Sequence, residues 1–306
     1  MKWLRASARC GLVWLALAVR GSGDPGPAQL SPADQTVTVL EYFPRWETPD
    51  DADAHQTVSA LARDCPDFLA MQKAAPAGSE KRRLVVRFFD SFEEAGQLIR
   101  AGRMNEAIFF DSWYGLPETW NKYRVFVQGL RTESGNPQLY EAFEWLAGRA
   151  EQFWADRAQH PPHWIPLDNP APTAADRRVF ATFDRVSPRW PESWKLLEEL
   201  RKNPPSYEDF RRRLPTGTRD YIVFDAILCY YDRAGTLVKN GIIDPRLLFT
   251  IWRSPTEVWL IVEPYVKKMR AEYHSPHLYD NIDWLVDFER AWRLRPENAK
   301  VGFGQT

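Results

Sequence analysis

The tryptophans of this chain recur at a fixed spacing, and this recurrence constrains the fold more than any other feature. When the sequence is shifted against itself by 139 residues, three pairs align without a gap: Trp113 with Trp252, Trp120 with Trp259, and Trp145 with Trp284. Only 14 of the 306 residues are tryptophan, so chance would rarely place three of them in one register. The sequence therefore predicts an internal duplication.

Other residues match at the same shift and extend the duplication. They include glycine, acidic, basic and tyrosine residues: Gly96 with Gly235, Glu118 with Glu257, Arg131 with Arg270, and Tyr140 with Tyr279. Further upstream, residues 44–46 resemble residues 188–190 at a shift of 144, which implies a small insertion or deletion between the copies. Each copy then spans about 120 residues, a common size for one domain.

The duplication divides the chain into five parts. These are a leader over 1–33, a first helical repeat over 34–159, a proline-rich linker over 160–173, a second helical repeat over 174–296 and a C-terminal tail over 297–306. The linker should be extended and stiff because proline restricts the backbone. Since duplication often replaces a homodimer by a pseudo-symmetric monomer, we expect a monomer whose copies pack through equivalent helices about an approximate two-fold axis.

Apolar residues recur with the helical period in both copies. Val85, Phe88, Phe92 and Ile99 follow this spacing, and so do the residues one shift later. No stretch alternates with period two over enough residues to predict a sheet. The predicted fold class is all-α, with two tandem helical bundles that each contain about four core helices and weaker lead-in helices.

Capping residues predict where the helices begin and end. Gly102 and its match in the second copy should end the first core helix, because glycine readily adopts the left-handed conformation. Asn105 and its match should cap the next helix. The last helix of each copy should begin at an Asn-Pro or Ser-Pro pair, residues 136–137 and 275–276.

The leader allows two interpretations. Basic residues at positions 2, 5 and 9 precede a charge-free run from Cys10 to Val19. This run is too short to span a bilayer, which takes about 20 residues, but the pattern fits a secretory signal peptide. An N-terminal extension on a cytoplasmic protein is the alternative. Export or membrane association through the leader and a cytoplasmic location therefore both stay open.

Charge and motif content exclude several classes of function. The chain has 40 Lys and Arg against 41 Asp and Glu, a net charge of −1, so we expect no nucleic-acid binding. The sequence contains no phosphate-binding loop, dinucleotide-binding glycine motif, zinc-protease motif or serine-hydrolase motif, so we expect no cofactor. Three scattered cysteines predict neither a disulfide framework nor a zinc site.

An aromatic-lined pocket in the second copy is the candidate ligand site. Trp252, Trp259 and Tyr279 would supply the rings, and Gly235 would let a small apolar ligand approach the helix backbone. A glycine inside a helix costs about 1 kcal/mol relative to alanine, so a specific contact must offset it. The alternative is that Gly235 only allows two helices to pack closely. No residue is predicted to be catalytic.

Two histidine pairs provide a weak alternative metal site. His160 and His163 lie in the linker, and His274 and His277 lie before the last helix. Imidazoles are good zinc ligands, but this spacing aligns two side chains only on a helix, and prolines interrupt both segments. We therefore expect no bound metal.

The repeated motif also resembles a known family. The segment 231–244, YDRAGTLVKNGIID, followed by Trp252 and Trp259, resembles the core of the domain-of-unknown-function family 4760. Both copies share the pattern, although the first departs from it with Glu94 in place of Arg233. The resemblance implies an uncharacterised bacterial helical protein, often with an N-terminal hydrophobic segment, in two tandem copies. It implies no activity, because the shared residues are packing residues.

These observations lead to two functional hypotheses. The first is a non-enzymatic interaction or structural module that binds an unidentified protein partner, because packing residues are duplicated whereas no plausible reacting group is. The second is a small-ligand-binding protein or enzyme that uses the aromatic-lined pocket.

Overall fold

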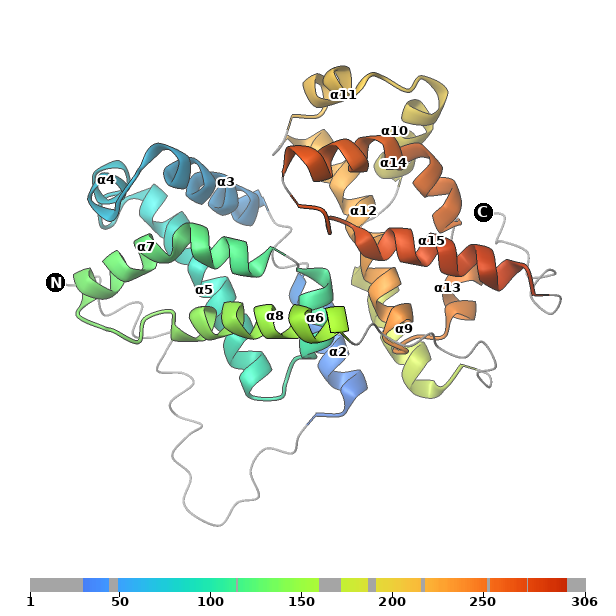
Figure 1. Cartoon of the computed structure of the whole chain (residues 1–306), viewed down its shortest axis with the longest axis horizontal. Coiled ribbons are helices and arrows are strands. Elements are labelled where there is room, and N and C mark those ends of the chain that lie inside the picture. The colour runs from blue at the N-terminus through green and yellow to red at the C-terminus, as the bar shows by residue number, and fades with distance from the viewer. Residues whose placement is uncertain are drawn as a thin grey trace, which may run out of the picture.

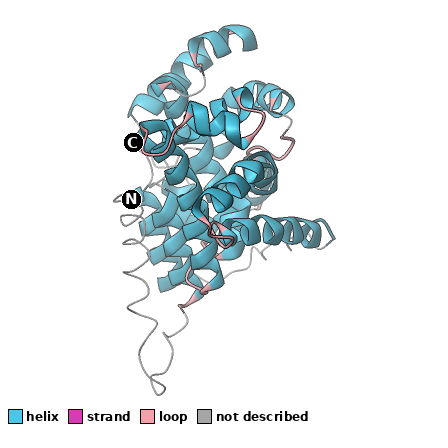
Figure 2. Ribbon diagram, turned by 90° about the vertical axis from the view of Figure 1, so that its left-hand side faces the viewer, coloured by secondary structure: helices cyan, strands magenta, loops and turns pink. Residues whose placement is uncertain are grey.

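Every regular element in the described part of the chain is a helix. The computed structural model describes residues 30–43, 49–113, 115–159, 172–186, 191–215, 218–251, 254–273 and 275–295. These residues form helices α2 to α15 and contain no strand (Figure 2). The all-α prediction is confirmed. Most of the leader, most of the linker and the C-terminal tail lie outside the described residues.

The two copies contain the same series of seven helices among the described residues. The first copy consists of α2 (Pro32–Tyr42), α3 (Pro49–Asp64), α4 (Phe68–Ala74), α5 (Glu80–Arg100), α6 (Glu106–Ser112), α7 (Leu116–Ser134) and α8 (Glu141–Gln159). The second consists of α9 (Ala174–Val186), α10 (Pro191–Lys202), α11 (Tyr207–Arg213), α12 (Arg219–Lys239), α13 (Pro245–Ile251), α14 (Pro255–Glu272) and α15 (Asp280–Arg293). Each lead-in segment thus forms three helices.

Capping side chains set the starts of the core helices. The Ser79 hydroxyl accepts a hydrogen bond from the backbone of α5, and Thr218 does the same at the equivalent start of α12. Asn105 accepts one from the Ile108 amide at 3.1 Å and begins α6, as predicted. Gly102 and Gly241 adopt φ values of 63° and 68° just after α5 and α12, which confirms the predicted helix ends.

The last helix of each copy begins later than predicted. Helices α8 and α15 start at Glu141 and Asp280 and not at the proline pairs. The residues just before them, Tyr140 and Tyr279, have left-handed φ values of 60° and 58°, so they interrupt any helix that enters from the proline side. The preceding residues form turns.

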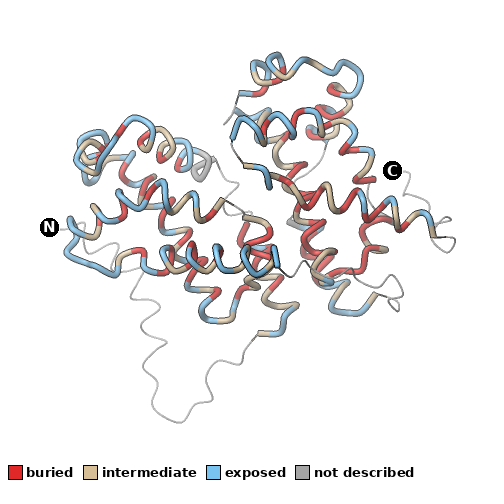
Figure 3. Tube along the Cα trace, viewed as in Figure 1, coloured by how far each residue is buried: buried red, intermediate tan, exposed pale blue. Residues whose placement is uncertain are grey.

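Helices α5 and α12 are at the centre of their copies. Helix α5 packs on α3 and α8, whereas α12 packs on α10 and α15. Figure 3 shows buried residues concentrated where these helices face their neighbours. The core of the first copy is aromatic, and Phe92 stacks on Phe143 with a centroid distance of 4.6 Å. In the second copy Phe210 stacks on Tyr265 at 4.3 Å.

The copies contact each other through equivalent helices, as the duplication predicted. Helix α2 packs on α9 in the middle of the molecule (Figure 1). Two ion pairs join these helices, Asp34 with Arg178 and Glu41 with Arg185, each with an N to O distance of 2.6 Å. The Arg233 guanidinium also lies 4.8 Å from the centre of the Phe43 ring.

A second contact between the copies breaks the symmetry. Helix α6 packs on α12, but no contact of similar extent joins the equivalent helices α13 and α5 in the described part of the chain. The burial of the two central helices reflects this difference. Thr236 of α12 is fully buried, whereas the equivalent Gln97 of α5 is exposed. The two central helices therefore have different surroundings.

Candidate functional site

In each copy, one acidic side chain of the central helix caps the N-terminus of the last helix. The Glu93 carboxylate accepts a hydrogen bond from the Phe143 amide of α8 at 3.0 Å, and the Asp232 carboxylate accepts one from the Asn281 amide of α15 at 3.0 Å. A carboxylate at a helix N-terminus satisfies a free amide and complements the helix dipole. The acid shared by the two copies at this position therefore has a structural role.

Two equivalent arginines, Arg131 near the end of α7 and Arg270 near the end of α14, also make the same contacts. The Nε of each donates to a carbonyl of the following turn, and a terminal nitrogen pairs with an acid of the last helix. The contacts are Arg131 with Leu139 and Glu144, and Arg270 with Leu278 and Asp283. Each arginine thus pairs with the last helix of its copy and holds the intervening turn.

The left-handed tyrosines are buried and bonded to carboxylates. The Tyr279 hydroxyl donates to Asp225, and burial raises the pKa of Tyr279 well above its usual value. Tyr140 makes the corresponding contact with Asp90. The two acids occupy different positions on α12 and α5, because Asp90 aligns with Cys229 and not with Asp225. The contact is therefore shared although its acid has moved by one helical turn.

The paired glycines lie where two helix backbones approach each other. A β-carbon on Gly96 would be 2.5 Å from the carbonyl oxygen of Ala142, and one on Gly235 would be 2.3 Å from that of Asn281. Both distances are far below van der Waals contact. The space beside Gly235 is therefore occupied by α15, which is the geometry of close helix packing.

The residues of the predicted aromatic pocket are partly in the described region. Trp259 is buried, and the Arg270 guanidinium lies 5.9 Å from the centre of its ring. The Tyr279 hydroxyl donates a hydrogen bond to Asp225. Trp252 lies outside the described residues, and the pocket stays a prediction. Among the histidines of the weak metal site only His277 is described, because residues 160, 163 and 274 lie outside. It is exposed and pairs with Asp280 at 2.7 Å.

No cluster of metal ligands occurs in the part of the chain that the structure describes. In that part, no three His, Cys, Asp or Glu side chains lie close enough together to hold one ion. The two described cysteines, Cys65 and Cys229, form no disulfide.

A buried polar cluster, here called the junction cluster, connects the two copies. It consists of Asp111 and Arg157 from the first copy and Lys239, Asn240 and Asn281 from the second. The Asn240 side-chain amide donates to the Asp111 carboxylate at 2.8 Å, and the Asn281 amide donates to the Asp111 backbone carbonyl at 3.0 Å. Arg157 pairs with the same carboxylate at 2.7 Å.

Burial shifts the pKa values within the junction cluster. Desolvation raises the pKa of Asp111, and the positive charge of Arg157 opposes this effect. Desolvation also lowers the pKa of Lys239, against the attraction of Asp111. The cluster therefore combines one buried carboxylate with two cations, Arg157 and Lys239, at the contact between the copies.

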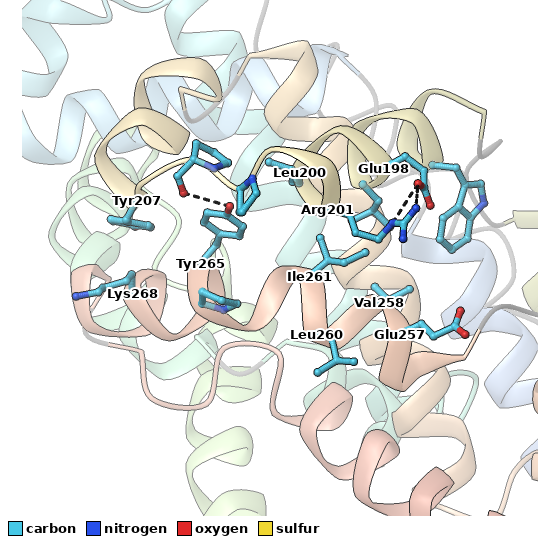
Figure 4. A pocket seen from close by; sticks show the side chains of 15 residues that line it. Glu198, Leu200, Arg201, Tyr207, Glu257, Val258, Leu260, Ile261, Tyr265 and Lys268 are labelled. Atoms are coloured by element: carbon cyan, nitrogen blue, oxygen red, sulfur yellow. Dashed lines mark hydrogen bonds and ion pairs between the residues drawn. The ribbon is translucent and has the colours of Figure 1, made fainter.

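An open groove lies between α10, α11 and α14, and we call it the repeat-2 groove. Its volume is about 810 Å³. Its apolar lining comprises Trp194, Leu197, Leu200, Pro204, Pro205, Tyr207, Val258, Leu260, Ile261, Pro264 and Tyr265. Figure 4 shows the α14 side chains along one wall. Leu260 is 65% exposed. At one end of the groove, the Tyr265 hydroxyl of α14 donates a hydrogen bond to the Pro205 carbonyl at 3.3 Å and so joins the two walls.

Comparison with known families agrees with the duplication. A model for a domain of unknown function, DUF4760, matches residues 34–150 and again residues 178–292. The two matches together cover most of the chain. This chain belongs to the DUF4760 family. A search of curated proteins and a search of solved structures each returned no match.

The two DUF4760 copies differ at the face that forms the groove. Leu260 and Ile261 of α14 occupy the positions of Asn121 and Lys122 in α7, so an apolar pair replaces a polar one. Near the other end of the same face, Lys268 occupies the position of Gly129. The second copy thus has more apolar residues at these positions of the helix and a lysine in place of the glycine.

That glycine explains why an aromatic ring packs on one end of the equivalent face in the first DUF4760 copy. The Phe68 ring of α4 packs so closely on Gly129 that a β-carbon there would lie 1.9 Å from it. Lys268 leaves no room for the equivalent ring, Tyr207, to pack in this way. Tyr207 instead lines the groove, and its hydroxyl bonds to Glu272.

The groove was not among the residues that the sequence predicted as a site. The signal that could have found it is the difference between the copies and not their identity, because Leu260 and Ile261 of one copy stand at positions that are polar in the other. Among the described residues no helix is long and apolar enough to cross a membrane.

Proposed function

We propose that this chain is a non-enzymatic interaction module, in which a duplicated helical scaffold presents the repeat-2 groove to a partner protein. The observation that carries this proposal is the divergence of the two DUF4760 copies. In both copies the central helix packs on the last helix in the same way, yet only the second has Leu260 and Ile261 where the first has Asn121 and Lys122.

The exposure of this face favours binding over a purely structural role. An apolar surface rimmed by polar residues commonly marks a site of protein interaction, because leaving it in water is unfavourable. Leu260 is among the most exposed large apolar side chains of the described residues. It lies beside Ile261 and Pro264, so the apolar surface is continuous along α14.

The shared polar residues support a role without catalysis. Glu93 and Asp232 cap the N-termini of α8 and α15. Arg131 and Arg270 donate hydrogen bonds to carbonyls of the turns that precede these helices. These contacts give the two shared acids and the two shared arginines the same structural role in both copies.

Site-specific photo-crosslinking tests the proposal. A benzophenone amino acid replaces Leu260 in the full chain expressed in its native cells, and Asn121, the equivalent exposed residue of the first copy, serves as the matched control. We expect a discrete crosslinked protein from position 260 only, and its loss when Ile261→Asp is added. Equal crosslinking from both positions, or none from position 260, would contradict the proposal.

A small apolar ligand is the second candidate, and the groove volume favours it. About 810 Å³ is within the range of small-molecule sites, roughly 300–1,000 Å³. Native mass spectrometry of the purified chain would then show a bound small molecule that Leu260→Asp removes. A spectrum with the bare chain mass in both variants would contradict this candidate.

A further inference from the structure

The unpaired charges of the repeat-2 groove lie at its two ends. Figure 4 shows Glu257 at one end of the α14 wall and Lys268 at the other. Both residues are exposed, and neither forms an ion pair with another described residue. The two charges on the opposite wall, Glu198 and Arg201, neutralise each other at 2.7 Å. The groove therefore offers a negative end and a positive end to whatever binds in it.

The surface between these charges is apolar on both walls. Leu197 and Leu200 come from α10, and Leu260, Ile261 and Pro264 come from α14. Apolar residues at such helical spacing form the usual seat for the apolar face of another helix. Glu257 and Lys268 are separated by eleven residues of α14, or about 16 Å at 1.5 Å per residue. An occupant of about three helical turns would span this distance.

We propose that the repeat-2 groove binds an amphipathic helix of a partner protein, antiparallel to α14. The first turn of this helix carries acidic residues that face Lys268, and its last turn carries basic residues that face Glu257. This inference rests on the proposed function, because it names the partner of the same groove.

Helix electrostatics determine the direction. A helix is stabilised by acidic residues near its N-terminus and by basic residues near its C-terminus. In a partner helix with this order of charges, the basic C-terminal turn must lie beside Glu257, at the start of α14, and the acidic N-terminal turn beside Lys268. The parallel arrangement would place like charges together at both ends.

Two synthetic peptides of about 14 residues, or four turns, test this arrangement. Both carry leucines at i, i+3, i+4 and i+7, a fluorescent label and the same hydrocarbon staple. One has glutamates in the first turn and lysines in the last, and the other has the reverse order. Fluorescence anisotropy measures their binding to the full chain, to a variant with Glu257→Lys and Lys268→Glu, and to Leu260→Asp.

We expect the peptide with acidic residues first to bind the unmodified chain about fivefold more tightly, because only this peptide forms both exposed ion pairs when it lies antiparallel to α14. The preference should reverse in the variant with exchanged charges, which separates the groove from any difference between the peptides. Circular dichroism checks that each variant keeps its helical content. Leu260→Asp should abolish binding of both peptides.

The alternative outcomes distinguish this inference from the proposed function. An unchanged preference in the charge-exchanged variant, or no binding of either peptide, would overturn the inference. If both peptides bind equally and Leu260→Asp abolishes binding, the antiparallel charge match is wrong but the interaction groove stands. A doubled solution mass that Leu260→Asp removes would assign the groove to a second copy of the chain and also overturn the inference.

Discussion

Tyr140 and Tyr279 are the only non-glycine residues with a positive φ in the described part of the chain. A bulky residue with positive φ costs roughly 1–3 kcal/mol and persists only where its surroundings hold it. Tyr140 and Tyr279 are held in this way, because each ring is buried and each hydroxyl is bonded to a carboxylate of the central helix. Their conformation fixes where α8 and α15 begin. Those starts in turn allow Glu93 and Asp232 to reach the first amides of these helices.

Adding one methyl group at Gly235 should separate two helices. Gly235→Ala places a β-carbon against the Asn281 backbone, so α15 must shift, and we expect a loss of about 2 kcal/mol in unfolding free energy. Gly148→Ala is the matched control, since its helical position has nothing within 4 Å. The control should gain about 0.5–1 kcal/mol from helix propensity. Urea unfolding measures both, and equal effects would show that Gly235 has no packing role.

Asp90 should make the stability of the first copy depend on pH. Although the residue as a whole is exposed, desolvation of its carboxyl raises its pKa to about 6, the Tyr140 hydroxyl opposes this, and the charges of Glu93 and Glu94 add to it. A raised pKa means that the folded state binds the proton more tightly than the unfolded state. The contribution of Asp90 to stability therefore rises as pH falls from about 6 towards 3.8.

The variant Asp90→Asn isolates this effect. The unfolding free energy of the variant relative to the parent should move in favour of the variant as pH rises from about 4 to 7, because only the parent then has a desolvated charge. Thermal or urea unfolding across this range measures the difference. A difference that stays constant with pH would contradict the raised pKa of Asp90.

At the scale of the elements, the sequence predicts helices well where local signals and packing agree. The stripe containing Phe88 and Phe92 predicted α5, and Asn105 predicted the start of α6, because the period and the cap are local properties. The starts of α8 and α15 were predicted four residues too early. They depend on a contact between a tyrosine and an acid more than 45 residues away in sequence, and tyrosine itself does not favour the left-handed conformation.

The groove illustrates a different limit of the sequence. Its two walls come from α10 and α14, which lie about 60 residues apart, and its openness depends on whether an aromatic ring can pack on the residue at position 129 or 268. No single segment carries that information. The duplication was recognised from residues that the copies share, whereas the groove arises where they differ.

The start of α15 should weaken when its carboxylate is removed. Asp232 is buried and accepts a hydrogen bond from the Asn281 amide at 3.0 Å, so Asp232→Ala leaves that amide without its partner. We expect a loss of about 2 kcal/mol in unfolding free energy. Asp287→Ala on the exposed side of the same helix is the control, with an expected change within about 0.5 kcal/mol. Hydrogen exchange should locate the loss of protection in the first turn of α15, and a uniform change along the chain would argue against a local role.

At the scale of the whole molecule, the contact between α2 and α9 determines the expected oligomeric state. In a homodimer this surface would join two chains, but here it is occupied within one. We therefore predict a monomer of 35.6 kDa by sedimentation equilibrium. A mass near twice this value would require another interface and would contradict the interpretation of the duplication as an internal dimer.

The junction cluster should couple the two copies into one folding unit. Arg157 and Arg149 are both on α8, and each pairs with an acid of α6, but only the acid of Arg157, Asp111, is fully buried and bonded to the other copy. Arg157→Met removes the ion-pair partner of the buried Asp111 carboxylate, which costs about 3–5 kcal/mol. Arg149→Met removes a partly exposed pair with Glu106, and such a pair contributes about 1 kcal/mol or less.

Differential scanning calorimetry and a double variant complete this test. We expect Arg157→Met to lower the unfolding temperature far more than Arg149→Met does. We also expect two unfolding transitions in place of one, because the variant weakens the junction cluster that joins the two copies. Adding Asp111→Asn should restore part of the loss, since it removes the unpaired charge but keeps an oxygen that accepts from Asn240. Equal effects of the two arginine variants would show that the cluster does not couple the copies. An Asp111→Asn change that only adds to the loss would show that charge burial is not its cause.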